Sequence, residues 1–363
     1  MTTTGAHEAA APRGDRSRST TRPRAVTLDD VARLAGVSRI TASRVVGGST
    51  KVSPLTRRAV EEAAAALGYV PNRAARALVT GRTDSVGLVL SRTVSDVFSH
   101  PFFADVTREL NRQLADEDVQ LLLLVAETQR DRERISRYAR GGHVDGFLVF
   151  QGHDENPLPE LLKRFDVPLV LGSRLMRADL DVSYVDFDND RAGHEAATFL
   201  LERGHRRIAC IAGPQHHSAG VDRLAGFRRA LSTAGCLDDR LVTETTYSVD
   251  SGESGLRAVL DAAPDITAAV ACSDLLTIGA LRELRRAGRR TPEDVEVVGF
   301  SDSDLLTEVE PDVSMVRQDL SVMASEMIRL LRAQTDGLRP PTSHVLLPAR
   351  LRPGRARDEA QPR

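Results

Sequence analysis

The chain has 363 residues, which is enough for two or three domains and for a sizeable hydrophobic core. Its 41% hydrophobic and 28% charged residues are ordinary for a globular protein and exclude a fibrous or wholly disordered chain. No apolar run approaches the roughly 20 residues that a membrane-spanning helix needs, and the start of the chain lacks the apolar stretch of a secretory signal. We therefore expect a cytoplasmic protein with no membrane partner.

The net charge of −2 conceals two regions of opposite sign. Residues 1–83 hold 14 Arg and Lys against 6 Asp and Glu, whereas residues 84–363 hold 35 against 45. A basic N-terminal region is typical of a module that binds a polyanion, because each phosphate that it neutralises releases a condensed counterion. A solvated basic surface would give the same balance, so charge alone leaves both interpretations open.

The elements expected in chain order divide the sequence into a small head and a large body. Residues 1–25 and 351–363 are polar, lack an apolar period and are expected to be disordered tails. Short helical patterns cover 26–70, and 71–83 is a connector with its own helical stretch. Over 84–350, apolar runs that predict strands alternate with amphipathic runs that predict helices. The predicted strands are 85–91, 119–126, 145–151, 167–173, 207–213, 268–273 and 295–301.

This alternation predicts the architecture of the body. Continuous apolar strands separated by helices indicate parallel sheets that are covered on both faces. Seven or more strands over this length favour two doubly wound lobes over one sheet. Ligands of such sheets bind beyond the carboxyl ends of the strands, so residues that directly follow strands are the candidates for a site. The helices expected between strands are 102–117, 194–204, 223–235 and 275–288.

The strongest local signal lies at 27–46. Thr27 is a candidate N-cap for a first helix, which Gly36 ends, and Ser38 is a candidate N-cap for a second. Two short helices joined by a tight glycine turn indicate a helix-turn-helix, whose second helix enters the major groove of DNA. A third helix, from about 54 to 67, is expected to close a core that two helices could not build alone.

The segment VTLDDVARLAGVSRITASRVVGG at 26–48, followed by KVSPLTRRAVEEAAAALGYVPNRAARALVTGRTDSVGLVL, closely resembles the start of the lactose-repressor/galactose-repressor family of bacterial transcription regulators. The resemblance extends over roughly residues 26–348. It implies a small all-α DNA-binding head, a hinge helix, and an α/β body of two doubly wound lobes that is periplasmic-binding-protein-like.

The resemblance also implies how the protein works. The first lobe is expected at about 84–185 and 315–340, and the second at about 186–314 and 341–350. The family implies a cytoplasmic homodimer that binds a pseudo-palindromic DNA operator and most simply represses genes of carbohydrate uptake or catabolism. A small sugar or related metabolite in the cleft between the lobes would be the effector, with no cofactor and no metal. A regulator that is independent of ligand, or that requires a corepressor, is the alternative.

Positions that contact DNA in this family fall on residues of the head and the hinge. Arg39, Ile40 and Arg44 match base-reading positions: arginine forks onto guanine, whereas Ile40 could only pack on a thymine methyl or a base edge. Leu78 matches the side chain that wedges into the minor groove and kinks the duplex. Without the motif, Arg39 would be interpreted as a solvated arginine and Leu78 as a core leucine. The other matched positions are Thr27, Ser38, Thr41, Ser43, Asn72 and Ala75.

Effector-binding positions of the family fall just after strands of the body, and their chemistry suits a small polyol. Arg223 could fork across vicinal hydroxyls, Asp274 or Asp302 could accept hydrogen bonds, and an aromatic ring could pack on a sugar face. Each has a structural alternative: one phenylalanine of a pair must be core, Arg223 could hold a loop, and Asp302 could cap a turn. The candidates are Phe102, Phe103, Arg174, Asp188, Arg223, Tyr247, Ser273, Asp274, Ser301 and Asp302.

Two departures from the family pattern affect this set. The family commonly has Asn-Asp where this chain has Ser273-Asp274, and Asp-Asp where it has Ser301-Asp302. Each departure replaces a longer hydrogen-bonding side chain with serine. A larger or differently functionalised ligand, or weak binding, is therefore expected.

Other functional classes have little support in the residues. The sequence has no GxGxxG after a strand, no GxxxxGK[ST], no GxSxG and no HExxH, so it does not indicate an enzyme. A transport-type binding protein would need a signal peptide and no head. The pair His216-His217 favours a cleft or loop feature over a metal site. Cys210, Cys236 and Cys272 lack the spacing of metal ligands and are expected to be buried thiols.

Overall fold

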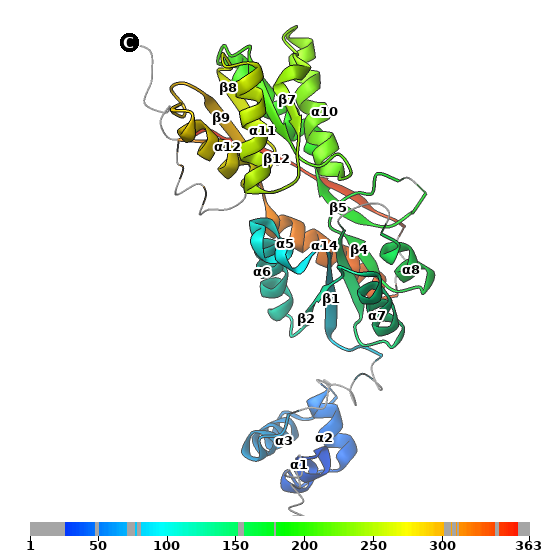
Figure 1. The fold of residues 1–363 in the computed structure, drawn as a ribbon. Coiled ribbons are helices and arrows are strands. Elements are labelled where there is room, and N and C mark those ends of the chain that lie inside the picture. Colours follow the sequence, from blue (N-terminus) through cyan, green and yellow to red (C-terminus); the bar gives the residue numbers. More distant parts are fainter. Residues whose placement is uncertain are drawn as a thin grey trace, which may run out of the picture. The chain divides into compact units, whose positions relative to one another are not determined.

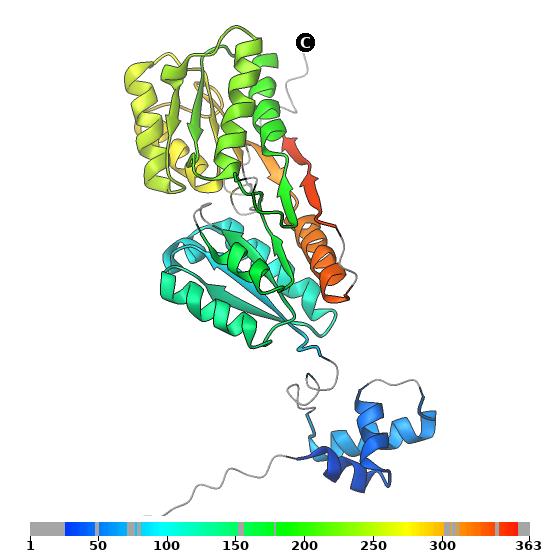
Figure 2. The ribbon, with the colours of Figure 1, turned by 90° about the vertical axis from the view of Figure 1, so that its right-hand side faces the viewer.

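The structure is a computed structural model that divides into two compact units, a head at residues 1–80 and a body at residues 81–363 (Figures 1 and 2). The residues that it describes are 26–47, 51–70, 77, 81–151, 156–177, 179–300, 306, 310, 312–337 and 341–354. None of the helices in this described part of the chain combines the length and the apolar character needed to cross a bilayer.

Three helices form the described part of the head, over the predicted ranges: α1 (Leu28–Leu34), α2 (Arg39–Val46) and α3 (Pro54–Leu67). The helix-turn-helix prediction is therefore confirmed. Their inner faces form a small core, because six side chains of the three helices are buried together. These are Val31, Ala32, Ala42, Val45, Val60 and Ala63.

The helix ends of the head follow from local sequence. The hydroxyls of Thr27, Ser38 and Ser53 each accept a hydrogen bond from a backbone N–H three residues further on, which satisfies a donor that the helix cannot. Gly36, at φ +67°, makes the tight turn between α1 and α2, a backbone conformation that glycine adopts at little cost.

Two six-stranded sheets form the described part of the body, one in each lobe (Figure 1). In spatial order, the first sheet contains β11 (His344–Leu347), β5 (Tyr184–Phe187), β4 (Leu169–Leu171), β3 (Gly146–Gln151), β1 (Ser85–Ser91) and β2 (Gln120–Val125). The second contains β12 (Ala349–Arg352), β10 (Ser314–Gln318), β9 (Glu296–Phe300), β8 (Ala268–Ala271), β6 (Ile208–Ala212) and β7 (Val242–Glu244). All neighbouring strands are parallel except β10 and β12, which are antiparallel.

Helices cover both faces of the first sheet, as the continuous apolar strands predict. Leu88 of β1 packs with side chains of α6 and α14, whereas the next residue, Val89, packs on the other face with side chains of α7 and α8. The helices of this lobe are α5 (Val94–Ser99), α6 (Pro101–Ala115), α7 (Gln129–Arg140), α8 (Leu158–Arg164) and α14 (Leu320–Thr335).

The second lobe has its own core, to which β6, β8 and β9 contribute fully buried strands. Of the helices that the structure describes from end to end in this lobe, α9 packs with α10 and α11 with α12. They are α9 (Asn189–Glu202), α10 (Ser218–Thr233), α11 (Val249–Ala262) and α12 (Asp274–Arg286), with a short 3-10 turn at Asp239–Leu241. The prediction of an α/β body with two doubly wound lobes is confirmed.

The order in which the chain crosses between the lobes corrects the expected boundaries. It crosses after β5, after β10 and after β11. The range 315–340 is therefore split, because β10 belongs to the second sheet and α14 to the first lobe. The range 341–350 is also split, since β11 joins the first sheet and β12 the second. Residues 351 and 352 belong to β12 and not to a tail.

These strands escaped prediction for a physical reason. β11 and β12 are four-residue edge strands whose side chains are mostly exposed or half-buried, so no continuous apolar run marks them. β10 is more buried, but its run SMVRQ ends in two polar side chains. Their place in the sheets is set by long-range pairing with β5, β9 and β10.

Candidate functional site

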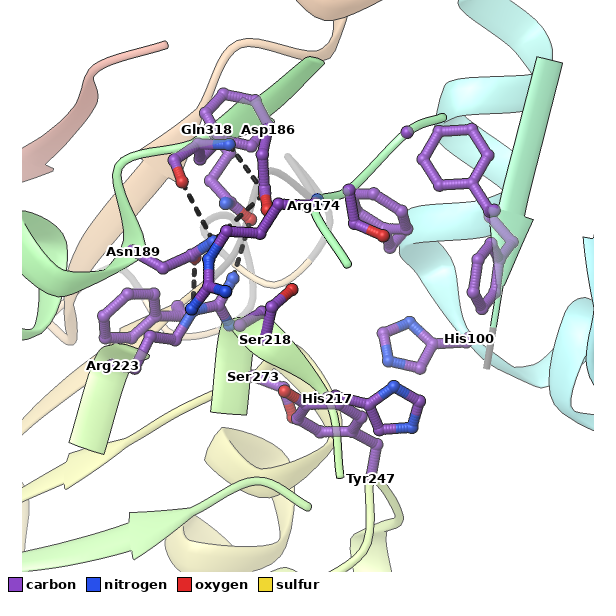
Figure 3. A pocket seen from close by; sticks show the side chains of 18 of the residues that line it. His100, Arg174, Asp186, Asn189, His217, Ser218, Arg223, Tyr247, Ser273 and Gln318 are labelled. Carbon is purple, nitrogen blue, oxygen red and sulfur yellow. Dashed lines mark hydrogen bonds between the residues drawn. The ribbon is translucent and has the colours of Figure 1, made fainter. Parts of the chain in front are cut away.

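A pocket lies between the two lobes at the carboxyl ends of the strands (Figure 3). Its empty space, counted together with the open solvent at its mouth, is about 920 Å³. From the first lobe it is lined by Arg92, His100, Phe102, Phe103, Phe150, Gly172, Ser173, Arg174, Asp186, Phe187 and Met323. From the second lobe it is lined by Asn189, His216, His217, Ser218, Ala219, Arg223, Tyr247, Ser273, Asp274, Phe300 and Gln318.

Arg223 of α10 is the most constrained cation of the pocket and is only 7% exposed. Its Nε donates to Asn189 Oδ1 at 2.9 Å, its Nη1 to the Cys272 carbonyl at 2.7 Å, and its Nη2 to Gln318 Oε1 at 3.3 Å. The guanidinium also lies over the Phe300 ring, 4.5 Å from its centroid. These bonds engage three of the five N–H groups of a guanidinium and fix its plane. Among the described residues, the other two N–H groups have no hydrogen-bond acceptor, so we expect them to be available to a ligand.

A close helix crossing brings Arg223 to Asn189. A Cβ atom on Gly226 of α10 would lie 1.9 Å from the Asp190 carbonyl oxygen, and one on Gly193 of α9 would lie 2.1 Å from the Arg223 carbonyl oxygen. Both positions must be glycine for the two backbones to approach this closely. The crossing therefore places the Arg223 side chain of α10 beside Asn189, the first residue of α9.

Asp186 is a buried carboxylate at the end of β5, with 5% exposure. Its Oδ2 accepts from the Arg174 N–H at 2.9 Å, and its Oδ1 accepts from the Phe187 N–H at 2.8 Å and from Asn189 Nδ2 at 3.2 Å. Burial raises the pKa of Asp186 to about 6, although these hydrogen bonds act in the opposite direction. The carboxylate is thus ionised at neutral pH and becomes protonated in mildly acidic solution.

An aromatic wall faces this polar cluster. The ring centroids of His100 and Phe103 are 5.5 Å apart, those of Phe102 and Phe150 are 5.7 Å apart, and Tyr247 lies 5.9 Å from His100. Figure 3 shows His100, His217 and Tyr247 gathered on one side of the pocket and Arg223, Asn189 and Gln318 on the other. An aromatic wall opposite a polar one suits a ligand with one apolar and one hydroxylated face.

Tyr247 has an unusual hydroxyl within this wall. The hydroxyl is buried and makes no hydrogen bond with any of the described residues. Burial raises the pKa of Tyr247, so the phenol stays protonated at neutral pH. A buried hydroxyl without a hydrogen-bond partner costs free energy, which makes this group exceptional in the pocket wall.

The pocket gathers seven of the ten residues predicted to bind the effector: Phe102, Phe103, Arg174, Arg223, Tyr247, Ser273 and Asp274. Phe103 is the core member of the phenylalanine pair, at 6% exposure, and still lines the pocket. The Ser273 hydroxyl accepts from the Leu276 N–H at 3.2 Å and caps α12, which gives this serine a structural task. Ser301 and Asp302 lie outside the described residues.

Asp188 is placed differently from the expectation. It does not line the pocket, because its carboxylate caps α9 by accepting from the Arg191 N–H at 3.1 Å. Its neighbours Asp186 and Asn189 line the pocket instead. Residues that sequence reasoning missed include these two, Arg92, His100 and Gln318. The run VDFDND around Asp188 is the signal that could have found the first two.

The histidine pair and the three cysteines of the body are also singled out by the sequence. His216 and His217 lie in the pocket wall, and the described residues contain no cluster of His, Cys, Asp and Glu that could hold a metal ion. Cys210 and Cys272 are buried free thiols, as predicted, and their Sγ atoms are 3.9 Å apart. Cys236 is only half-buried.

The predicted DNA-contacting residues of the head are displayed on α2. Arg39, Ile40 and Arg44 are exposed, and Ile40 has 66% of its surface open although it is apolar. Arg39 Nε lies 3.6 Å from Asp29 Oδ1. The hydroxyls of Ser38 and Thr41 are 2.9 Å apart at the helix start. Thr27 and Ser43 also lie in the described head, whereas Asn72, Ala75 and Leu78 lie outside the described residues.

Comparison with known proteins agrees with both units. Residues 27–72 match the model of bacterial regulatory proteins of the lacI family, and residues 197–356 match the periplasmic binding protein-like domain. The chain is 47% identical over 312 residues to the HTH-type transcriptional regulator CelR of Thermobifida fusca, which covers 85% of this chain and 92% of that protein.

Solved structures extend the comparison. A complex of the transcriptional regulator CelR with cellobiose has a TM-score of 0.70 at 44% identity, covering 91% of this chain and 98% of that one. The lac repressor dimer bound to operator and the anti-inducer ONPF has a TM-score of 0.77, covering 90% of this chain and 98% of that one. At 23% identity, the second likeness is one of fold alone.

Proposed function

The chain belongs to the lacI family of bacterial regulatory proteins, and on this premise we propose that it is a ligand-responsive transcription regulator that represses genes of carbohydrate uptake or catabolism. It acts in the cytoplasm as a homodimer on a pseudo-palindromic operator, and a small sugar in the pocket between the lobes controls its affinity for DNA. The pocket binds this sugar without converting it, so the protein is not an enzyme. The observation that carries the proposal is a displayed recognition helix in one unit and a polar-and-aromatic pocket in the other.

The recognition helix supplies the DNA contacts. Arg39 and Arg44 fork onto guanines in the major groove, and Ile40 packs on a thymine methyl or a base edge. Burying the exposed Ile40 side chain against DNA would contribute favourable free energy to binding, which supports a contact at this position. One head covers a single half-site, so a two-fold dimer is needed to bind two half-sites about one helical turn apart. Leu78 completes the contact by wedging into the minor groove between them.

We propose a short glucoside of the cellobiose type as the effector. Two features support it: the relative that is 44% identical over 91% of this chain has a structure with cellobiose, and the pocket is lined by both polar and aromatic side chains. The two remaining N–H groups of Arg223 donate to sugar hydroxyls, and Asp274 accepts from them. Tyr247 supplies the phenol hydroxyl, and Phe102 packs on a sugar face.

Ligand binding changes the operator affinity by changing the arrangement of the two lobes. Because the pocket is lined from both lobes, a bound sugar has different contacts in different lobe arrangements and shifts their equilibrium. The first lobe starts at β1, only a few residues after the head ends at residue 80. In a dimer, a change in the first lobes therefore alters the separation of the two heads and with it the operator affinity.

Selection of genomic DNA fragments by the purified full-length protein tests the proposal. Retained fragments should share a pseudo-palindrome of about 14–20 base pairs, visible by footprinting, and cellobiose should weaken that footprint. A footprint that appears only with a ligand would identify a corepressor, and one that no sugar changes would identify a ligand-independent regulator. Retention without any shared sequence would contradict the assignment as a sequence-specific regulator.

A further inference from the structure

An ion pair joins the two lobes beside the pocket. Arg174 follows β4 in the first lobe, and Asp222 lies on α10 in the second. Arg174 Nε donates to Asp222 Oδ2 at 3.0 Å, and Arg174 Nη2 donates to Asp222 Oδ1 at 2.5 Å. Two parallel hydrogen bonds between a guanidinium and a carboxylate fix the relative direction of both groups, which a single contact does not.

The pair is partly shielded from water. The side chains of Arg174 and Asp222 are 31% and 21% exposed, which is less than most surface ion pairs in this chain. The bond to Asp222 raises the pKa of Arg174, so the arginine is charged throughout the physiological range. By contrast, Arg92 of the first lobe reaches His217 of the second with an Nη2 to Nε2 distance of 3.5 Å, at the limit of a hydrogen bond. Arg174 and Asp222 thus make the better-formed tie.

The ion pair is continuous with the polar floor of the pocket. The Arg174 N–H donates to Asp186, Asp186 accepts from Asn189, and Asn189 accepts from Arg223. This chain of hydrogen bonds starts in the second lobe at Asp222, passes through the first lobe at Arg174 and Asp186, and returns to the second. It also follows the crossing of the backbone after β5. Asp222 is therefore connected by hydrogen bonds to Asp186, Asn189 and Arg223, which line the pocket.

We propose that Asp222, which does not itself line the pocket, is a positioning residue that holds Arg174 across the cleft, stabilises the lobe arrangement described here and thereby raises effector affinity. Loss of the carboxylate frees the Arg174 guanidinium and weakens the tie between the lobes. Alternative lobe arrangements then become more populated. The apparent affinity for the effector falls, because a smaller fraction of the protein is in the arrangement that binds it. The part of this inference that concerns effector affinity rests on the proposed function, whereas the part that concerns the lobes does not.

The distance between the lobes in the ligand-free protein is the direct test. One spin label is attached to Arg130→Cys on α7 and another to Ala262→Cys on α11, both exposed, in a Cys236→Ser background that leaves only the two buried native thiols. Labelled chains are mixed with an excess of unlabelled protein so that distances within one chain dominate. Asp222→Asn should raise the population outside the wild-type distance peak about three- to tenfold.

Two further variants separate this role from general damage. Asp190→Asn removes the partner of Arg229 between α9 and α10, a more exposed Arg–Asp ion pair that lies within one lobe, and should leave the distances unchanged. Asp222→Glu keeps the charge and should restore most of the wild-type peak. An Asp222→Asn distribution that coincides with the wild type, or a shift of equal size in Asp190→Asn, would overturn the proposal.

Salt dependence keeps the test decisive if Asp222→Asn does not fold by circular dichroism. Raising sodium chloride from about 0.05 M to about 0.5 M screens a partly exposed ion pair and should broaden the wild-type distribution, while Asp222→Glu responds in the same way. A wild-type distribution that salt leaves unchanged would then count against the tie.

Effector affinity adds a second readout. In calorimetry with cellobiose, Asp222→Asn should bind about two- to fivefold more weakly than wild type, and Asp190→Asn should match it. If the wild type binds no cellobiose, the proposed effector fails while the distance measurement still decides the role of Asp222. If Asp222→Asn binds cellobiose as tightly as wild type, Asp222 does not influence the site.

Discussion

The head and the body place their functional side chains in opposite environments. On α2 the candidate DNA-reading residues are exposed, with Ile40 66% open, whereas in the pocket Arg223 is 7% exposed and bonded to three partners. A displayed side chain contributes little to folding, so its replacement affects binding alone. A buried one is part of the fold, so its replacement affects binding and stability together. The two sites should therefore respond differently to the same kind of mutation.

Removing Arg223 should give the largest effect and should affect both properties. Arg223→Ala leaves Asn189, Gln318 and the Cys272 carbonyl without their donors, which should cost about 3 kcal/mol of unfolding free energy. Cellobiose binding should become undetectable by calorimetry. Urea denaturation of the full-length protein measures the first effect, and Arg223→Lys, which keeps the charge but loses the fork, should be intermediate in both. A fully stable Arg223→Ala protein would contradict a structural role for this buried side chain.

Asp186 predicts a pH dependence with a definite sign. Its pKa is raised from 3.8 to about 6 by burial, so the folded protein binds this proton more tightly than the unfolded chain does. Ionised Asp186 therefore reduces stability at pH 7 by about 3 kcal/mol, and the reduction disappears as pH falls from about 6 to about 4.

The measurement compares wild type with Asp186→Asn, which cannot ionise. Urea denaturation between pH 4 and pH 8 should show a smaller fall of stability with rising pH in the variant than in wild type, because the carboxylate contribution is absent. Identical pH profiles would mean that Asp186 has an ordinary pKa in the folded protein.

Arg44 provides the matching test in the head. Arg44→Ala should change the unfolding free energy by less than about 0.5 kcal/mol, because the side chain is exposed. It should nevertheless relax base preference at one operator position by about 1–3 kcal/mol, measured by binding to a set of single-base operator variants. A uniform loss of affinity over all variants would instead assign Arg44 to the DNA backbone.

Tyr247→Phe should have the smallest effect and the most specific one. The hydroxyl makes no hydrogen bond with the described residues, so its removal should leave the unfolding free energy unchanged or slightly raised. Cellobiose affinity should fall by about 1 kcal/mol, roughly fivefold, through loss of one hydrogen bond. Unchanged affinity would remove Tyr247 from the set of ligand contacts.

The same contrast explains what the sequence could predict. The helices of the head begin and end where local signals put them, at the caps Thr27 and Ser38 and at the turn glycine Gly36. Strands such as β1 and β3 were predicted because both of their faces are covered and their apolar runs are continuous. The helix ends are determined by residues that are close in sequence, and the strands are marked by a simple apolar pattern.

The pocket depends on contacts that no local pattern records. Asp186, Asn189 and Gln318 join the site because β5, α9 and β10 meet where the chain crosses between the lobes. The close approach of α9 to α10 depends on Gly193 and Gly226. Nothing in the neighbouring sequence shows that these two glycines face each other's helices. Positions after strands were predictable from the architecture, whereas the assignment of short edge strands to lobes required the structure.

Operator binding as a function of cellobiose concentration shows whether the pocket between the lobes controls the affinity for DNA. With an operator fragment obtained by genomic selection, fluorescence anisotropy should show that cellobiose lowers the DNA affinity of the wild type, and that Arg223→Lys needs higher cellobiose concentrations for the same change. This result would connect the pocket to the recognition helix. If cellobiose and other sugars change the operator affinity of neither protein, the pocket does not control DNA binding and the account is wrong.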